Sequence, residues 1–119
     1  MLEIRNSVGR GRGVFATADI SAGQIIHVDH SRELTPADLV LFDLTSVSGH
    51  WFEHPVKTGY GLLPIGYSGL VNHSDDPNAV LSWQQSEIGC TGSLISLKNI
   101  GKNDEIFIDY GVDTPSDWC

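Results

Sequence analysis

The sequence predicts a single domain that is mainly β, with many short strands and one short helix. Short runs of β-branched and aromatic residues recur along the 119 residues, and turn-forming residues separate them. A helix start stands out once, at Thr35-Pro36-Ala37-Asp38. A hydrophobic content of 40% and a charged content of 18% are typical of a folded globular domain, and no apolar run is long enough to cross a membrane.

The first elements surround a run of glycines. Leu2 and Ile4 alternate with polar neighbours, which predicts a short first strand. Glycines then occupy every second position from 9 to 13, a spacing that a regular strand does not show and that permits positive φ angles and a close approach of the backbone to a ligand. A glycine-rich hairpin turn is the alternative. Residues 14–16, Val-Phe-Ala, predict the next strand.

Two later segments share one spacing. Ile20, Gly23 and Ile26 follow one another at intervals of three, and residues 100, 103 and 106 repeat this spacing with Ile, Asn and Ile. Gly and Asn are the residues that best tolerate the left-handed backbone conformation. Each segment is therefore predicted to be a tight turn leading into a strand, at residues 24–29 and 105–109.

The helix is expected between these two turns. Thr35 can cap it, Pro36 suits its first position, and Asp38 complements the dipole of the first turn. It should end by residues 48–49, at a Ser-Gly pair. Further short strands are expected at 51–53, 61–63, 79–84 and 92–97, with turns at 57–59 and 86–89.

Charge is unevenly distributed over the chain, whose net charge is −8. Residues 1–12 hold three arginines against one glutamate, whereas residues 13–119 hold four basic and fourteen acidic side chains. Such a surface repels nucleic acid and anionic lipid and attracts a cationic partner such as a lysine-rich peptide. Solubility alone is the simpler explanation of the same charge.

One catalytic pattern, H-x-x-E-H, is formed by His50, Glu53 and His54. A zinc hydrolase would need both histidines on one face of a helix. Trp51 and Phe52 favour a strand instead, which would separate the histidines by about 13 Å at ~3.3 Å per residue. The zinc site is therefore the less favoured alternative.

Two polar motifs stand at expected strand ends. Asn72-His73-Ser74 follows an apolar pair, and Asn78 lies behind Pro77, which restricts the backbone. Near the end of the chain, Tyr110 closes a run in which residues 106, 108 and 110 share one face. A polar turn and a buried tyrosine would explain each motif separately.

Together with Gly11-Arg12-Gly13, these motifs resemble the SET-domain protein lysine methyltransferases. The resemblance extends from about Glu3 to Gly111 and is closest to the minimal form found in small viral and bacterial members. It implies several small curved β-sheets, one short helix and a C-terminal pseudoknot. It also implies a SET domain over residues 1–111 and a short tail, residues 112–119, that completes the cofactor site or the lysine channel.

The resemblance implies S-adenosyl-L-methionine as the cofactor and assigns roles by position. The backbone around Gly11, Arg12 and Gly13 would hold the methionine end of the cofactor. Asn72 would take its amino group and the His73 backbone would meet the adenine. Tyr110 would be the catalytic tyrosine and would also contact the cofactor. Ile108 and Tyr67 would line the substrate channel. Trp118 would lie against the adenine or the channel, and a frayed terminal residue is the alternative for it.

The implied activity is transfer of a methyl group to a lysine amine of a basic protein or peptide, for which a histone-like substrate is the model. Ile108 stands where relatives tune the number of methyl groups, and its lack of a hydroxyl predicts a di- or trimethyl product. No metal, direct nucleic-acid binding or membrane contact is expected, and a homodimer is allowed. The expected location is intracellular, in the cytoplasm or at nuclear or host chromatin. A catalytically silent SET-like module that binds a basic peptide is the main alternative.

Overall fold

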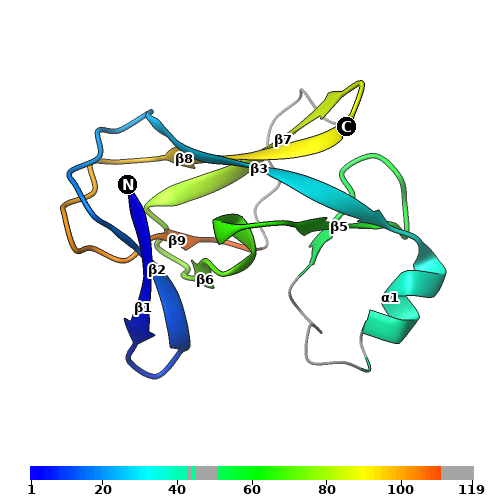
Figure 1. The fold of residues 1–119 in the computed structure, drawn as a ribbon, viewed down its shortest axis with the longest axis horizontal. Coiled ribbons are helices and arrows are strands. Elements are labelled where there is room, and N and C mark those ends of the chain that lie inside the picture. The colour runs from blue at the N-terminus through cyan, green and yellow to red at the C-terminus, as the bar shows by residue number, and fades with distance from the viewer. Residues whose placement is uncertain (43, 45–50, 111–119) are drawn as a thin grey trace.

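The computed structural model describes residues 1–42, 44 and 51–110. Within them, the strands form a two-stranded sheet (β1-β2), a five-stranded sheet in the order β4-β5-β3-β8-β7, and a second two-stranded sheet (β6-β9) (Figure 1). The elements are β1 (Leu2–Ser7), β2 (Gly11–Ala16), β3 (Ile25–Leu34), α1 (Pro36–Phe42), β4 (Phe52–Glu53), β5 (Gly61–Pro64), the 3₁₀ turn η1 (Tyr67–Gly69), β6 (Asn72–His73), β7 (Ala79–Ser86), β8 (Gly89–Ser96) and β9 (Phe107–Ile108). The predicted mainly β architecture with one short helix is confirmed.

The glycine run is both a hairpin turn and the start of a strand. Gly9 and Gly11 have φ angles of 76° and 80°, which only glycine adopts without strain. Nevertheless β2 begins at Gly11 and pairs with β1, with Gly13 opposite Arg5. The expectation that the glycine run is not a regular strand holds at Gly9 and Gly11, which have positive φ angles, whereas pairing with β1 includes Gly13 in a regular part of β2.

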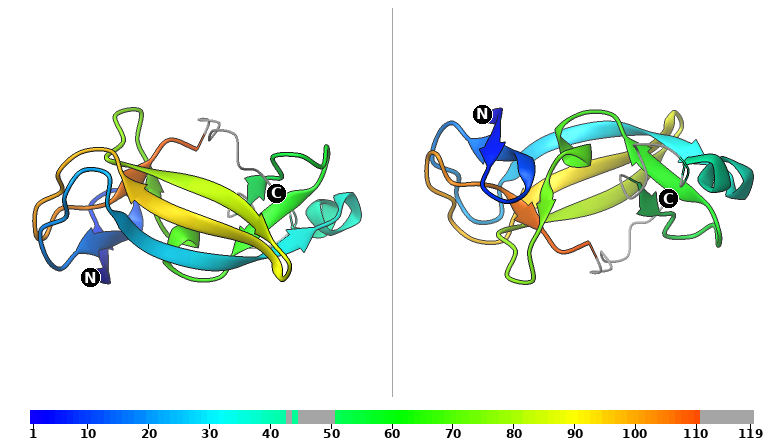
Figure 2. Two further views of the ribbon diagram at one scale, coloured as in Figure 1. Left: turned by 90° about the horizontal axis from the view of Figure 1, so that it is seen from above. Right: turned by 90° about the horizontal axis from the view of Figure 1, so that it is seen from below.

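The five-stranded sheet is built around β3, which is longer than predicted. Its first half pairs with β8 and its second half, Ser31 to Leu34, pairs with β5. Two successive partners extend the strand beyond Asp29, where the sequence pattern ended. Figure 2 shows β3, β8 and β7 side by side and curved together.

The two similar isoleucine segments contact each other. Ile20 and Ile100 exchange backbone hydrogen bonds of 2.8 Å in both directions. Gly23 and Asn103 have φ angles of 80° and 74°, so both predicted left-handed turns are confirmed. This pairing brings the second turn, and the strand that follows it, beside β2.

The helix begins as predicted but is shorter. Thr35 and Asp38 exchange hydrogen bonds between side chain and backbone of 2.9 and 3.2 Å, which is a capping box with an aspartate. The helix ends at Phe42, before the expected end at residues 48–49, which lie outside the described residues. No helix in the described part of the chain has the length and apolarity needed to cross a bilayer.

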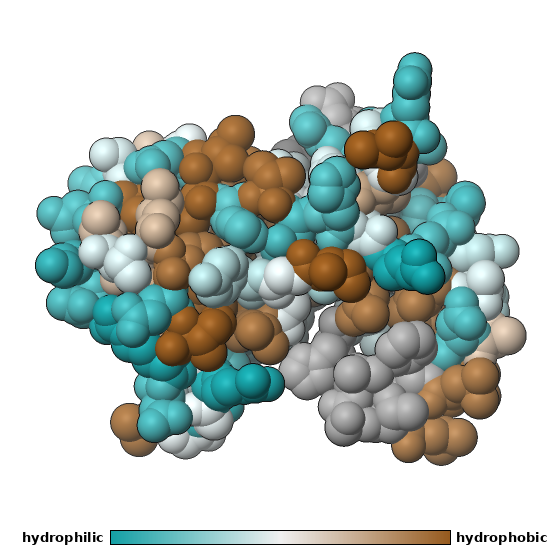
Figure 3. Space-filling view, in the orientation of Figure 1, coloured by the Kyte–Doolittle hydropathy of each residue, from teal (hydrophilic) through white to brown (hydrophobic). Residues whose placement is uncertain are grey.

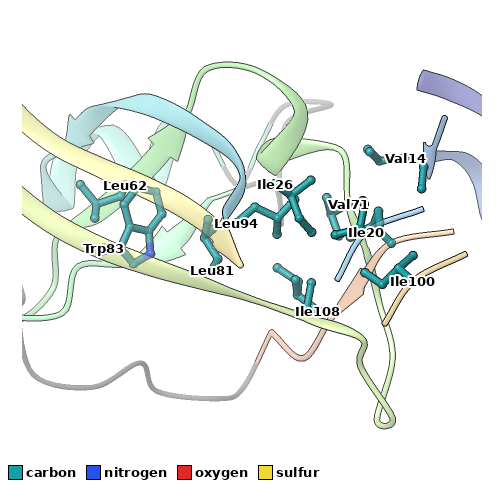
Figure 4. Close-up of a cluster of buried hydrophobic side chains, with 13 residues drawn as sticks. Val14, Ile20, Ile26, Leu62, Val71, Leu81, Trp83, Leu94, Ile100 and Ile108 are labelled. Carbon is teal, nitrogen blue, oxygen red and sulfur yellow. The ribbon is translucent and has the colours of Figure 1, made fainter. Parts of the chain in front are cut away.

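The hydrophobic core runs from the five-stranded sheet to the β1-β2 hairpin. Figure 4 shows Trp83 and Leu62 at one end of the cluster and Val14 and Ile100 at the other. Ile108 of β9 belongs to this cluster and is 2% exposed. The core therefore anchors β9, and the residues flanking it are held where the three sheets meet.

Candidate functional site

The site is organised by the parallel pairing of β6 with β9, in which Asn72 lies opposite Phe107 and His73 opposite Ile108. Asn78 fastens the two segments together. Its amide donates to the Glu105 carbonyl and accepts from the Phe107 amide, each at 2.8 Å. The predicted pseudoknot would be built around these paired segments.

Asn72 connects this junction to the glycine run. Its Nδ2 donates to the backbone carbonyl of Arg12 and to Oε2 of Glu105, both at 2.8 Å. The structure therefore brings Arg12, Gly13 and Asn72 together, although 60 residues separate Arg12 from Asn72. Gly11 lies at the start of β2, and no atom outside its chain neighbours lies within 4 Å of the place where a β-carbon would stand.

Gly13 is required by this close approach. A β-carbon at this position would overlap the Glu105 carboxylate and lie 3.1 Å from Asn72 Nδ2. Neither neighbour can withdraw without losing its hydrogen bonds. The role of Gly13 is thus steric, unlike that of Gly11, whose backbone conformation itself favours glycine.

Tyr110 lies just beyond β9 and is held at both ends. Its hydroxyl donates to the Val71 carbonyl at 2.5 Å, and its backbone amide donates to Nδ1 of His73 at 3.1 Å. Its ring lies 6.0 Å from that of Phe52, edge to face. Burial raises the pKa of the Tyr110 hydroxyl above its ordinary value, so the group is a neutral phenol near pH 7.

The His73 side chain has a role that the sequence did not indicate. Because its Nδ1 accepts from Tyr110, the ring hydrogen of the neutral imidazole lies on Nε2. Nε2 lies 2.9 Å from Asp75 Oδ1, which is a hydrogen-bonding distance. Asp75 and His73 thus hold the backbone of Tyr110 in place.

The remaining predicted site residues are less closely connected to this centre. Tyr67 lies in η1, with its hydroxyl 3.4 Å from the Leu2 carbonyl and its ring 5.1 Å from that of His27. Ile108 is buried in the core, so its place in a substrate channel stays a prediction, as does that of Tyr67. Trp118 lies outside the described residues.

Two residues at the site were missed by the sequence interpretation. Glu105 accepts hydrogen bonds from Asn72 at 2.8 Å and from Ser7 Oγ at 2.6 Å. Ser7 is 98 residues away from it in the sequence. Local sequence spacing could not reveal that Ser7, Glu105 and Asn72 meet, because the three residues lie in or beside different strands.

The zinc alternative finds no support in the described residues. Phe52 and Glu53 form strand β4, as predicted, and not a helix. Nδ1 of His54 accepts the backbone amides of Val56 and Lys57 at 3.1 and 2.9 Å, while His50 lies outside the described residues. No group of three potential metal ligands occurs in the described part of the chain.

Comparison with known proteins agrees with this geometry. The SET domain family matches residues 11–111. A histone-lysine N-methyltransferase of Schizosaccharomyces pombe, specific for H3 lysine-37, is 28% identical over 117 residues, which cover 92% of this chain and 73% of that protein.

Solved structures show the same fold. A Plasmodium falciparum protein assigned as a histone methyltransferase is 28% identical with a TM-score of 0.77, over 96% of this chain and all of that one. The Neurospora histone lysine methyltransferase DIM-5 superimposes with a TM-score of 0.70 at 21% identity, over 99% of this chain and 54% of that chain. A polycomb repressive complex 2 bound to S-adenosylmethionine has a TM-score of 0.78 at 19% identity, over 97% of this chain and 16% of that one.

The chain belongs to the SET-domain family. The predicted fold class is confirmed by these structures. The methyltransferases of this family use S-adenosylmethionine as the methyl donor, in agreement with the predicted cofactor.

Proposed function

We propose that this chain is a protein-lysine N-methyltransferase that uses S-adenosylmethionine. The observation that carries the proposal is the β6-β9 junction, which gathers Asn72, His73 and Tyr110 beside Gly13. The hydrolase alternative would use His50, Glu53 and His54, of which Glu53 lies in strand β4. The junction offers an amide, a phenol, an imidazole and backbone groups. These are groups that bind and orient reactants.

The residues at the junction fit the cofactor. Both hydrogens of the Asn72 amide are bonded to Arg12 and Glu105, so its oxygen remains to accept a hydrogen bond from an ammonium group. Gly11 and Arg12 are exposed, and no atom lies near the place of a β-carbon at Gly11, so the backbone here is open to a ligand. We assign the methionine end to the backbone of residues 11–13, the amino group to Asn72 and the adenine to the His73 backbone, with Trp118 in the tail as an adenine or channel contact.

When bound, S-adenosylmethionine supplies a methyl group activated by a sulfonium. Tyr110 is fixed by its two hydrogen bonds, and its oxygen keeps lone pairs for weak CH···O contacts with a polarised methyl group. As a phenol with a raised pKa, Tyr110 is not a base near neutral pH. A lysine amine, with a pKa of about 10.4, loses its proton through desolvation in a narrow channel, to which Tyr67 and Ile108 are assigned. Alignment of that amine supplies much of the rate enhancement.

The proposed substrate is a lysine-bearing basic protein, of which a histone tail is the model. Fourteen acidic side chains in residues 13–119 favour such a partner and disfavour nucleic acid. With a histone as substrate the chain would act at chromatin, and with another basic protein elsewhere in the cell. Residues 1–111 are proposed as the catalytic domain and residues 112–119 as the segment that completes its site. Homodimerisation is a separate question, which a measurement of the mass in solution would answer.

The test combines binding with product analysis. Calorimetry with S-adenosylmethionine and its demethylated product should show binding in the presence of a metal chelator. Core histones and a cell extract should gain methyl groups on lysine, located by mass spectrometry. Absence of binding at millimolar cofactor would contradict the proposal, and binding without methylation of any substrate would favour the silent module.

A further inference from the structure

We propose that Glu105 is a positioning residue that orients the Asn72 amide and thereby gives the site its selectivity for a cofactor with an amino group. The proposal rests on the proposed function, because it concerns the same site. It adds a role for a side chain that touches neither reacting atom. The chain of contacts is Ser7 to Glu105 to Asn72, with Gly13 providing the space.

The Asn72 amide has only one orientation that satisfies its neighbours. Its Nδ2 faces the Arg12 carbonyl and the Glu105 carboxylate, each at 2.8 Å. Both are acceptors without a hydrogen to donate. Rotating the amide by half a turn would place Oδ1 against two oxygens, so the NH₂ group must face inward. Within the described part of the chain, no donor is bonded to Oδ1.

Glu105 is itself held firmly. Ser7, which is 5% exposed, donates its hydroxyl to Oε1 at 2.6 Å. The backbone beside Glu105 is joined to β2, since Ile106 donates to the Val14 carbonyl at 2.7 Å. The carboxylate is thus anchored through one oxygen and orients Asn72 through the other, in the space that a side chain at Gly13 would fill.

The consequence is a preference for a cationic amine. Oδ1 of Asn72 accepts from an ammonium group, whereas an inverted amide would present hydrogens to it. The negative charge of Glu105 favours the same cation. Removing the carboxylate leaves the Arg12 carbonyl as the sole partner that orients the amide. Affinity for the amino group should then fall, while affinity for the rest of the cofactor is retained.

The experiment compares two ligands, S-adenosylhomocysteine and its analogue without the α-amino group, by calorimetry. The wild type should prefer the amine by about tenfold or more, which is the range for hydrogen bonds to a charged group. Glu105→Met keeps the approximate length of the side chain without an acceptor, and should lower the ratio several-fold, because only the Arg12 carbonyl then orients the Asn72 amide. Glu105→Gln should restore most of the preference, because its oxygen can accept from Asn72 while its NH₂ group donates to Ser7 Oγ.

Two further variants separate orientation from general effects. Glu87→Met removes one negative charge from the exposed β7-β8 turn and should leave the ratio unchanged. Ser7→Ala retains Glu105 but frees Oε1, and should lower the ratio by a smaller factor. It provides the test if Glu105→Met does not fold. Circular dichroism identifies the folded variants.

Two results would overturn the assignment in different ways. An unchanged ratio in folded Glu105→Met, or in Ser7→Ala if that is the folded variant, would overturn the role of Glu105 alone. A wild type that binds neither ligand would overturn the proposed function and this assignment together. The two failures are distinguished by the wild-type titration.

Discussion

The Tyr110 hydroxyl makes a structural hydrogen bond, and we propose that it also acts in catalysis. The bond to the Val71 carbonyl at 2.5 Å fixes the ring, and the raised pKa keeps the group protonated. Both properties suit a group that orients a methyl group without accepting a proton from lysine. Changing this single atom should therefore separate binding from turnover.

Tyr110→Phe should lower turnover by about tenfold or more with little change in cofactor affinity, since the hydroxyl acts mainly in the transition state. Stability should fall by about 1 kcal/mol from the lost hydrogen bond. The measurements are kcat, the cofactor Kd and thermal unfolding. Tyr60→Phe, at a partly buried tyrosine that packs against Lys57, is the control. Equal turnover in Tyr110→Phe and wild type would place the chemistry elsewhere.

Ile108 is expected to influence the number of methyl groups added. We predict a di- or trimethyl product for the wild type and a shift toward monomethyl in Ile108→Tyr, because the new hydroxyl can hold a water in the space of a larger product. Ile108 is 2% exposed, so added volume alone could disturb the site. Ile108→Phe supplies that volume without a hydroxyl and is the matched control. Mass spectrometry after exhaustive reaction counts the methyl groups, and a wild type that stops at one would refute the idea.

His54 links stability to pH. Burial lowers its pKa, an effect that Glu33 opposes and Lys57 reinforces, and protonation of Nδ1 would break the bonds from Val56 and Lys57. A depressed folded-state pKa stabilises the protein above the unfolded value of about 6.5, and this stability is lost as pH falls through the folded-state pKa. The free energy of unfolding should therefore decrease below about pH 6.5.

The test is denaturant unfolding at pH 7.5 and at pH 5. His54→Asn should be less stable at the higher pH and should show a smaller decrease between the two. His30→Asn, which changes an exposed histidine of β3, should retain the wild-type dependence. The same decrease in His54→Asn and wild type would assign the acid sensitivity to other groups.

At the scale of elements, β6 and β9 are very short strands that depend on side-chain contacts. Each has two residues, too few for stable pairing on their own. Asn78 compensates with bonds to the backbone on both sides of Ile106, and Ile108 anchors β9 in the core (Figure 4). The geometry of the site therefore depends on Asn78, which lies outside it.

Asn78→Ala should destabilise the fold by about 2–4 kcal/mol, because two backbone groups lose their partners. Amide exchange at residues 105–108 should accelerate, and cofactor affinity should fall with it. Denaturant unfolding and hydrogen exchange measure these effects. Asn6→Ala, at an exposed position of β1, is the control. Wild-type exchange at residues 105–108 in Asn78→Ala would show that the strand pair holds without it.

At the scale of the whole molecule, the dominant feature is charge. Residues 13–119 carry fourteen acidic and four basic side chains. On the face shown in Figure 3, polar side chains are interspersed with separate apolar groups. Recognition of a basic substrate should therefore depend on charge attraction over a distance, which dissolved salt screens beyond about 10 Å at 0.1 M.

Raising the salt concentration from 50 to about 300 mM should increase the KM for a basic peptide several-fold while the cofactor Kd changes little. The proposed cofactor contacts are local, whereas the proposed attraction of the peptide is summed over the surface. Steady-state kinetics and calorimetry at matched ionic strengths measure the two constants. A KM that does not respond to salt would contradict electrostatic recognition of the substrate.

The sequence by itself determined the features that depend on neighbouring residues. The capping box at Thr35, the left-handed turns at Gly23 and Asn103 and the strand at residues 52–53 follow from local backbone preferences, and all three are observed. The motifs around Asn72 and Tyr110 also sufficed to indicate the family. These features could be predicted because their main causes lie within a few residues of one another in the sequence.

Only the tertiary structure decided which distant groups meet. Pairing with β1 and β5 set the limits of β2 and β3, and the β6-β9 junction placed Glu105 between Asn72 and Ser7. The reason for Gly13 was visible only there, since the atoms it would strike belong to residues far along the chain. Contacts of this kind depend on how strands are packed together, and the period of side chains along one strand does not specify its neighbours.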